Sequence, residues 1–375
     1  MVRVSEVVVE EQEAPIHGDI LEAILSHVPL TDLVPASHVS KAWQRAVFSS
    51  LQNFNTLKPW LIVHTQSSRS PYATTTHAYD PRSHVWIEIK QPPIKYVSAL
   101  RSSHSNLLYM LSPSKLSFSF DPLHLTWHHA DAPLVWRTDP IVALVGHRIV
   151  VAGGTCDFED DPLAVEIFDV ETRTWDTCQS MPAVLKDSAA STWLSVASNN
   201  HKLFVTEKHS GVTHVFDPET KTWYGPYHLR PDKKVFFSVI AFSSDRLVLV
   251  GLVGESDNVE SVKLWEMDCE TFQCREIGEM PLTLLEKLKS GFQLSSISVC
   301  LTGKFMYIHN PSDVKEVFVC EFINGGCKWG SVRNAVANDR TKIAERFVFT
   351  CSEVGIDDVK MALRSENRRF AMKNL

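Results

Sequence analysis

The feature that most constrains the fold is a short motif that recurs about every fifty residues. Its clearest copy, FDPETKTW, covers 216–223, and a nearly identical copy, FDVETRTW, covers 168–175. Two further copies cover 79–86 and 120–127, and a weaker one at 267–274 has cysteine in place of tryptophan. The aspartates of these copies are separated by 41, 48, 48 and 51 residues, which indicates a repeat architecture.

Each copy of the motif predicts a tight turn between two β-strands. Aspartate can accept hydrogen bonds from the backbone that follows it, and proline presets the φ angle that a turn needs. The threonine and tryptophan that come next favour a strand. We therefore expect four hairpins, each with a large ring in the core of its repeat unit; these rings are Trp86, Trp127, Trp175 and Trp223.

Short apolar runs between the motifs predict the remaining strands. One set comprises 60–63, 107–111, 149–152, 203–205, 247–250 and 305–308, and a second comprises 97–100, 141–145, 194–197, 238–242 and 297–300. Runs of this length, bounded by turn residues, are typical of strands buried on both faces. Together with the hairpin, they make units of four strands, which predicts a mainly β protein built as a β-propeller.

The strand inventory also predicts how the propeller closes. The first unit lacks its opening strand, and a spare strand is expected at 346–351. Pairing this strand with 60–63 would join both ends of the domain and remove exposed sheet edges. The result is a six-bladed propeller over 58–355. Its sixth unit is weak, since 318–322 and Trp329 replace the motif, so five blades remain the alternative.

The segment 15–57 differs from everything that follows it. Its apolar spacing predicts an amphipathic helix over 18–28 that ends at Pro29, a second helix with Thr31 near its start, and a third over 39–51. A segment of this size rarely encloses a core of its own. Its large apolar side chains must therefore be buried against the rest of the chain or against a partner.

Composition narrows the classes of function. The formal net charge of −7 does not suggest a nucleic-acid surface, and no apolar run reaches membrane-spanning length. The start of the chain lacks the basic and apolar regions of a signal peptide. The eight cysteines form no C-x-x-C pair. We therefore expect reduced thiols and a location in the cytoplasm, the nucleus or both.

The two ends of the chain carry opposite charge. Residues 1–14 are acidic and predict a disordered tail. Residues 356–375 are rich in lysine and arginine and predict a solvated basic tail, with a basic signal or a lipid contact as the alternative.

The motifs of common catalytic and metal sites are missing from the sequence. There is no His-x₃-His, no His-Glu-x-x-His, no Gly-x-Ser-x-Gly and no phosphate-binding glycine-rich loop. We therefore expect no catalytic residue, metal or cofactor, and a propeller enzyme is a less favoured alternative.

The helical segment resembles an F-box. Pro15-Ile16-x-x-Asp19-Ile20-Leu21, then the stretch 24–33 (ILSHVPLTDL) and Val39-Ser40-Lys41-x-Trp43 follow the F-box pattern, although Ser40 replaces the usual cysteine and Ile16 follows rather than precedes its proline. The resemblance implies docking on a Skp-family adaptor, which links an F-box to a cullin–RING ubiquitin ligase. The implied contact set is Pro15, Ile16, Ile20, Leu21, Ile24, Leu25, Pro29, Leu30, Leu33, Val39 and Trp43, with Leu25 and Trp43 as anchors.

The repeat region resembles the kelch family. Gly153-Gly154 matches the double glycine of kelch blades, but this pair is clear in only one unit. We expect both glycines, like the motif tryptophans, in the core of the blades. The whole chain resembles the plant F-box/kelch-repeat proteins, which implies a three-helix F-box followed by a six-bladed kelch-type propeller.

The resemblance implies the substrate-recognition subunit of a Skp–cullin–F-box ubiquitin ligase. The propeller loops would present a protein target for ubiquitination and degradation, and the subunit itself would not be an enzyme. Several plant relatives act on enzymes of phenylpropanoid and flavonoid synthesis, so such an enzyme is one expected target. The alternative is an adaptor-independent kelch scaffold, which would bury the helical segment within the chain.

Overall fold

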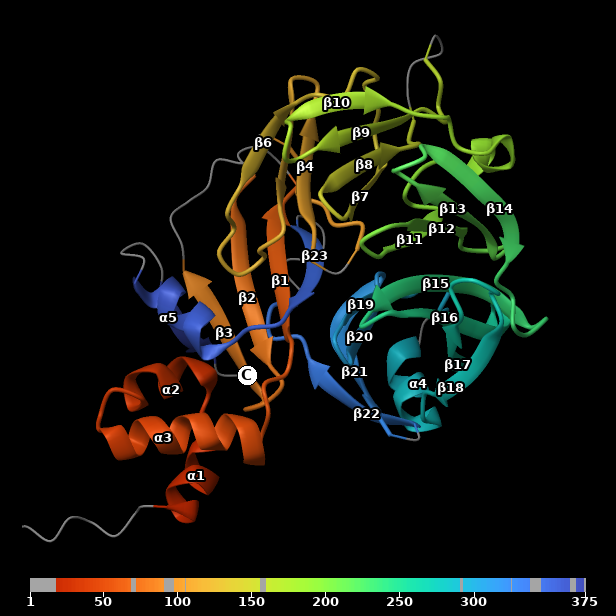
Figure 1. The fold of residues 1–375 in the computed structure, drawn as a ribbon. Helices are drawn as coiled ribbons and strands as arrows, with labels where there is room; N and C mark the ends of the chain where they lie inside the picture. The colour runs from red at the N-terminus through yellow and green to blue at the C-terminus, as the bar shows by residue number, and fades with distance from the viewer. Residues whose placement is uncertain are drawn as a thin grey trace, which may run out of the picture.

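The computed structural model describes residues 18–68, 72–90, 98–104, 106–155, 160–290, 293–324, 326–337, 345–364 and 369–373. Six β-sheets stand around a central axis, and short helices pack beside the first sheet (Figure 1). The prediction of a six-bladed propeller preceded by short helices is therefore confirmed.

Blade 1 contains both early and late segments of the chain. Its strands lie in the order β23-β1-β2-β3-β24. Their bounds are Trp60–Ser67 for β1, Thr74–Asp80 for β2, Val85–Lys90 for β3, Glu345–Ser352 for β23 and Arg369–Lys373 for β24. The strand expected at 346–351 thus lies within β23, antiparallel to β1, and Val63 is paired with Phe349. Every backbone group of β1 faces a neighbouring strand, which removes an exposed edge.

Blade 2 has three strands among the described residues: β4 (Leu108–Ser112), β5 (Lys115–Ser119) and β6 (His128–Asp131). The strand predicted at 97–100 is not formed by residues 98–100. Its place next to β4 is taken by a single bridge between Arg101 and Tyr109. Val97 lies outside the described residues.

Blades 3 to 6 each have four antiparallel strands, and the chain enters each of them at the innermost strand. Blade 3 consists of β7 (Ile141–Val145), β8 (Arg148–Ala152), β9 (Val165–Asp169) and β10 (Thr174–Thr177). Blade 4 consists of β11 (Leu194–Ser198), β12 (Leu203–Glu207), β13 (Val212–Asp217) and β14 (Thr222–His228).

Blade 5 consists of β15 (Val235–Ser243), β16 (Arg246–Glu255), β17 (Asn258–Met267) and β18 (Cys274–Glu279). Blade 6 consists of β19 (Ser298–Thr302), β20 (Phe305–Asn310), β21 (Asp313–Ile323) and β22 (Gly326–Arg333). Two short helices connect blades: η2 (Ala183–Ser188) and α4 (Leu282–Lys289). Apolar side chains fill the spaces between neighbouring sheets, as in the cluster that blades 5 and 6 share with α4.

The N-terminal helices are α1 (Asp19–Leu25), α2 (Leu30–Ala36) and α3 (Lys41–Ser49), followed by the π-helical turn η1 (Ser50–Phe54). Helix α3 begins at a side-chain cap, because the Ser40 hydroxyl accepts a hydrogen bond from Trp43 N at 3.2 Å. Helix α2 begins directly after Pro29, so Thr31 lies inside the helix rather than at its cap. The Leu30 amide is instead 3.4 Å from the Asp80 carboxylate of blade 1.

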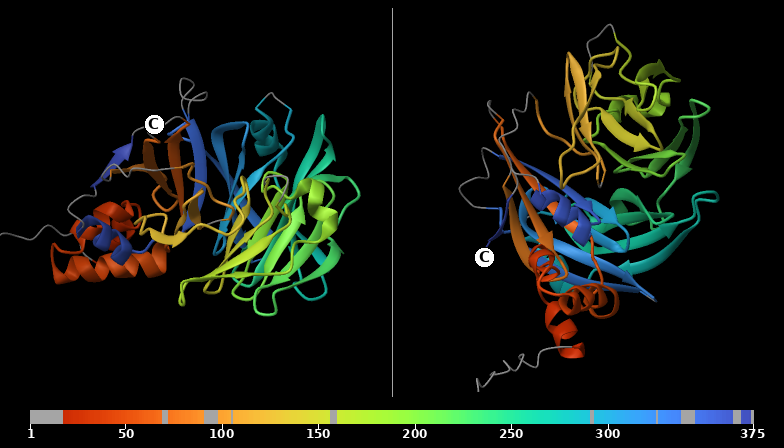
Figure 2. Two further views of the ribbon diagram at one scale, coloured as in Figure 1. Left: turned by 90° about the horizontal axis from the view of Figure 1, so that it is seen from above. Right: turned by 60° about the vertical axis from the view of Figure 1, so that its left-hand side comes forward.

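The C-terminal residues are not the solvated tail that their charge predicts. Residues 356–364 form α5 (Ile356–Arg364), which buries Ile356, Val359 and Ala362. Residues 369–373 form β24, which is paired with β3 in the register of Phe370 with Ile89. Both views of Figure 2 show α5 together with the N-terminal helices at one side of the propeller. Arg364 and Arg369 are exposed, whereas Lys360 and Lys373 are half-buried.

Candidate functional site

Most of the apolar side chains of the N-terminal helices face the propeller. Leu21, Leu25, Leu30 and Leu33 are buried in one cluster with residues of blade 1 and of α5. Leu25 is only 2% exposed and therefore belongs to the core of this chain. This finding replaces the expected anchor role of Leu25, because a partner can reach its side chain only if the helices leave the propeller.

A smaller set of apolar side chains remains exposed. Ile20 is 62% exposed, Ile24 is 48% exposed and Val39 is 63% exposed. Ile20 and Ile24 are one turn apart on the same face of α1. We call these three residues the exposed apolar set. Among the other predicted contacts, Pro29 and Trp43 are half-buried, and Pro15 and Ile16 lie outside the described residues.

A buried arginine fixes the helices to blade 1. The Arg82 guanidinium donates hydrogen bonds to the carbonyl oxygens of Val28, of Leu25 at 2.7 Å, and of Asn55 at 3.1 Å. Burial lowers the pKa of Arg82, and the nearby Asp80 carboxylate opposes that shift. Sequence reasoning missed this residue. One feature of the sequence could have pointed to Arg82. This copy of the motif has arginine two residues after its aspartate, where the other copies have leucine or glutamate.

The motif tryptophans are not equally buried. Trp86 is almost fully buried, whereas Trp127, Trp175 and Trp223 are half-buried on the outer parts of their blades. This corrects the expectation that all four lie fully in the core. The difference arises because the outermost strand of a blade has only one neighbouring strand and faces solvent on its open side.

The structure explains why the two predicted positions need glycine. Gly153 and Gly154 both have positive φ angles, of 66° and 98°. A Cβ atom at Gly153 would stand 2.3 Å from the carbonyl oxygen of Ala189, and one at Gly154 would stand 2.7 Å from that of Thr138. Any other residue would force the backbone of blade 3 to move.

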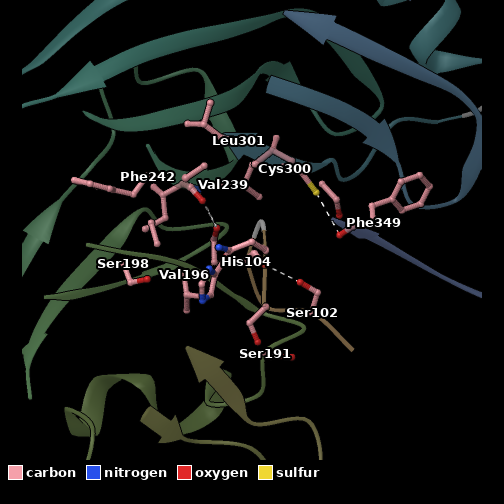
Figure 3. A pocket seen from close by; sticks show the side chains of 18 of the residues that line it. Ser102, His104, Ser191, Val196, Ser198, Val239, Phe242, Cys300, Leu301 and Phe349 are labelled. Atoms are coloured by element: carbon pink, nitrogen blue, oxygen red, sulfur yellow. Dashed lines mark hydrogen bonds between the residues drawn. The ribbon is translucent and has the colours of Figure 1, made fainter. Parts of the chain in front are cut away.

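The inner strands of the propeller surround a central cavity of about 1010 Å³. Figure 3 shows side chains from several blades around this space, among them His104, Val196, Val239 and Cys300. Burial lowers the pKa of His104 to about 4 and that of His309 to about 3. Both imidazoles are therefore neutral near pH 7, and the wall of the cavity is largely uncharged.

Charged side chains gather at one mouth of this cavity. Arg101, Asp139, Lys208 and Arg346 all line it and come from separate parts of the chain. Arg101 forms an ion pair with Asp139. Lys208 Nζ donates hydrogen bonds to the carbonyl oxygens of Ser191, at 3.3 Å, and Thr192, at 2.8 Å. We call Arg101, Lys208 and Arg346 the cationic mouth.

The cationic mouth and the helices lie at opposite ends of the propeller. Arg346 is paired with Gln66 near the end of β1, whereas Trp60, at the start of β1, packs in the cluster that contains the helices. The stretch of strand between Trp60 and Gln66 spans about 20 Å at roughly 3.3 Å per residue. The cationic mouth and the helices are therefore separated by the length of this strand.

Across the described parts of the chain, no group of three or more histidine, cysteine, aspartate and glutamate side chains is arranged to hold a metal ion. In the same ranges, no helix is both long enough and apolar enough to cross a membrane.

Comparison with known proteins agrees with this division into helices and propeller. A family model for the F-box domain matches residues 18–54, which are the helical segment. The structure therefore defines a class of protein: an F-box joined to a β-propeller. The chain belongs to the F-box/kelch-repeat family, because it is 46% identical over 371 residues to F-box/kelch-repeat protein At1g23390 of Arabidopsis thaliana, covering 95% of this chain and 94% of that protein.

Two more distant relatives match parts of the chain. The putative F-box/kelch-repeat protein At3g27910 of Arabidopsis thaliana is 23% identical over 254 residues, covering 60% of this chain and 63% of that protein. Kelch repeat and BTB domain-containing protein 8 of Danio rerio is 25% identical over 122 residues, covering 32% of this chain and 20% of that protein.

Proposed function

We propose that this chain is the substrate-recognition subunit of a Skp–cullin–F-box ubiquitin ligase, acting in the cytoplasm, the nucleus or both. The observation that carries the proposal is the exposed apolar set on a segment that matches the F-box model. Ile20, Ile24 and Val39 occupy apolar positions of that segment, yet the propeller does not cover them. Apolar side chains of this size lose contact with water when a partner helix packs on them.

The proposed subunit acts by position rather than by catalysis. The adaptor would hold the helical end, and the target would bind at the loops or the mouth of the propeller. A target held in this way has a raised effective concentration near the catalytic arm of the ligase. An enzyme of phenylpropanoid or flavonoid synthesis as the target remains a prediction that rests on the family resemblance alone.

The second candidate function is a kelch scaffold that works without an adaptor. The burial of Leu21, Leu25, Leu30 and Leu33 inside this chain favours it, because these side chains already have a place to pack. The exposed apolar set separates the two functions, since a scaffold has no use for it.

Co-purification with a Skp-family adaptor tests the proposal. The intact chain should bind the adaptor, and the double variant Ile20→Asp/Ile24→Asp should lose binding while it stays folded. Leu134→Asp is the matched control, because Leu134 is also strongly exposed but lies on the propeller. If the intact, folded chain does not bind the adaptor, the ligase function is overturned and the scaffold becomes the better account.

A further inference from the structure

We propose that the cationic mouth binds an acidic, extended segment of the target protein; this inference rests on the proposed function, because it names the class of target segment. The segment would enter the cavity at the end of the propeller opposite to the helices. Carboxylates of the segment would pair with Arg346 and Lys208.

Positive charge converges at this mouth of the cavity. Arg101 lies at the entry to blade 2, Lys208 in the turn between β12 and β13, and Arg346 on the inner strand of blade 1. Residues that are far apart in the sequence thus bring three cations to one mouth. The nearby positive charge of Arg101 adds to burial in lowering the pKa of Arg346. An arrangement of like charges in a partly buried place is unfavourable unless an anion balances it.

The Asp139 carboxylate of the mouth is already engaged. Asp139 accepts hydrogen bonds from the Ser191 hydroxyl at 2.7 Å and the Thr192 hydroxyl at 2.6 Å, besides its ion pair with Arg101. Burial alone would raise the pKa of Asp139, but these hydrogen bonds and the charge of Arg101 hold it below its ordinary value. Asp139 therefore orders this part of the mouth and balances Arg101.

Lys208 and Arg346 keep binding capacity for a ligand. Lys208 Nζ uses two of its three hydrogen atoms on main-chain carbonyl groups, so one donor remains. Burial lowers the pKa of Lys208 to about 8, although Asp139 and Glu207 oppose the shift. Arg346 makes no ion pair with any residue that the structure describes. An arriving carboxylate would form charge-assisted hydrogen bonds with both groups.

Glu207 is the other carboxylate close to Lys208, and it is also engaged. It accepts a hydrogen bond of 2.6 Å from Ser210 N and one of 3.3 Å from His209 N, which closes the turn after β12. Among the residues that the structure describes, the three cations of the mouth therefore outnumber Asp139 and Glu207.

An exposed aromatic ring, that of Trp193, lies next in sequence to a residue that binds Lys208. Trp193 follows Thr192 directly, and nearly half of its surface is exposed. Its carbonyl oxygen accepts a hydrogen bond from Lys208 N at 3.0 Å, so the turn of Lys208 is tied to the tryptophan. His209 lies beside it, with ring centroids 6.1 Å apart. Tryptophan and arginine together are typical of the residues that dominate protein–protein binding, which favours a peptide over a small anion.

A displayed library of random peptides tests the proposal. Each peptide is about twelve residues long and can extend roughly 40 Å. The library is panned against the intact chain, and recovered peptides are labelled with fluorescein for anisotropy titrations. We expect these peptides to be enriched in aspartate and glutamate and to bind more weakly as salt is raised. The Lys208→Gln/Arg346→Gln variant should bind them about tenfold more weakly or worse.

The control is Lys304→Gln, which removes one positive charge from the exposed turn between β19 and β20, at the other end of the propeller. It should bind the peptides as the intact chain does. Equal thermal midpoints for all three proteins would show that the variants are folded. The proposal is overturned if no peptide is enriched, if the recovered peptides are not acidic, if inorganic phosphate competes as well as the peptides do, or if the double variant binds them with unchanged affinity.

Adaptor co-purification of the same preparations separates this inference from the proposed function. If the chain binds acidic peptides but does not bind the adaptor, the ligase function is overturned and the peptide site is supported. Adaptor binding without acidic peptides would overturn the peptide site alone.

Discussion

Trp86 Nε1 donates a hydrogen bond of 3.0 Å to the carbonyl oxygen of Arg333, which lies 247 residues further along the chain. Trp86 belongs to blade 1, and Arg333 ends the outer strand of blade 6, so the bond crosses the seam where the propeller closes. The same position of the motif links other neighbours, since Trp175 binds the carbonyl oxygen of Asp131 and Trp223 that of Gln179, both at 3.1 Å. The repeated tryptophan is therefore a link between blades.

Loss of the tryptophan at the seam should cost more stability than loss of its equivalents. Trp86→Ala removes a buried ring and should destabilise the protein by about 3–5 kcal/mol. Trp175→Ala removes a half-buried ring and should cost clearly less. Midpoints of urea unfolding, followed by fluorescence and by circular dichroism, would measure the difference. Equal losses would show that the seam has no special role.

Arg82 should determine how firmly the F-box is held on the propeller. Arg82→Leu leaves the carbonyl oxygens of Leu25, Val28 and Asn55 without this donor, at a cost of about 1–3 kcal/mol for each buried group that stays unpaired. Hydrogen exchange of the amides in 19–36 should become faster, while the inner strands of blades 3 to 6 should not change. Arg246→Leu, at an exposed arginine of blade 5, is the control. Unchanged exchange in 19–36 would rule out this role.

Helix α5 should help to hold the F-box against the propeller. Val359 is fully buried against the helices, so Val359→Asp places an uncompensated charge in that cluster. We expect faster tryptic cleavage within 19–57 and a lower thermal midpoint. Met361→Asp on the exposed face of the same helix should leave both properties close to those of the intact chain. Similar damage by both substitutions would contradict the proposed packing.

Buried histidines should make the protein less stable in mild acid. Burial lowers the pKa of His64 to about 3, with a smaller contribution from the charge of His77, and burial alone lowers that of His309 to about 3. In the unfolded chain a histidine has a pKa of about 6.5, so the unfolded state binds more protons between these values. The free energy of unfolding should therefore fall as the pH decreases below about 6.5.

Replacement of one of these histidines tests this pH dependence. At pH 5 each group should contribute a loss of roughly 2 kcal/mol relative to neutral pH. His309→Gln should reduce the pH dependence of the urea midpoint, whereas His201→Gln, at an exposed position, should leave it unchanged. An identical pH profile for His309→Gln and the intact chain would show that His309 does not titrate on unfolding.

The sequence could predict those parts of the fold that depend on local patterns. The aspartate and tryptophan spacing located the hairpins, and the count of strands placed a closing strand at 346–351 beside β1. It could not separate Ile24 from Leu25, because both are apolar and only the packing against blade 1 decides which one is covered. Helix α5 was missed because charged residues, such as Asp357, Asp358 and Lys360, interrupt its apolar ones.

The cationic mouth could not be found from the sequence for a different reason. Arg101, Lys208 and Arg346 follow no common motif, and each lies next to ordinary strand residues. Only the closing of the ring brings them to one place. Sites built from single residues of several blades are set by tertiary structure, whereas the F-box is a continuous segment that a pattern can reveal.

The packing of α5 and β23 has a consequence for how the protein is made. A ribosome produces the F-box before the propeller, but blade 1 and the cluster that contains α1 and α2 are completed only when β23 and α5 leave the exit tunnel. Until then, the leucines of the F-box lack the part of their cluster that Val354, Ile356 and Val359 supply, and they are more available to chaperones. Translation that stopped before β23 would therefore leave out both β23 and α5. Such a product would lack the strand that closes the ring and the helix that packs against the F-box. Cellular quality control can recognise the apolar surface that this exposes.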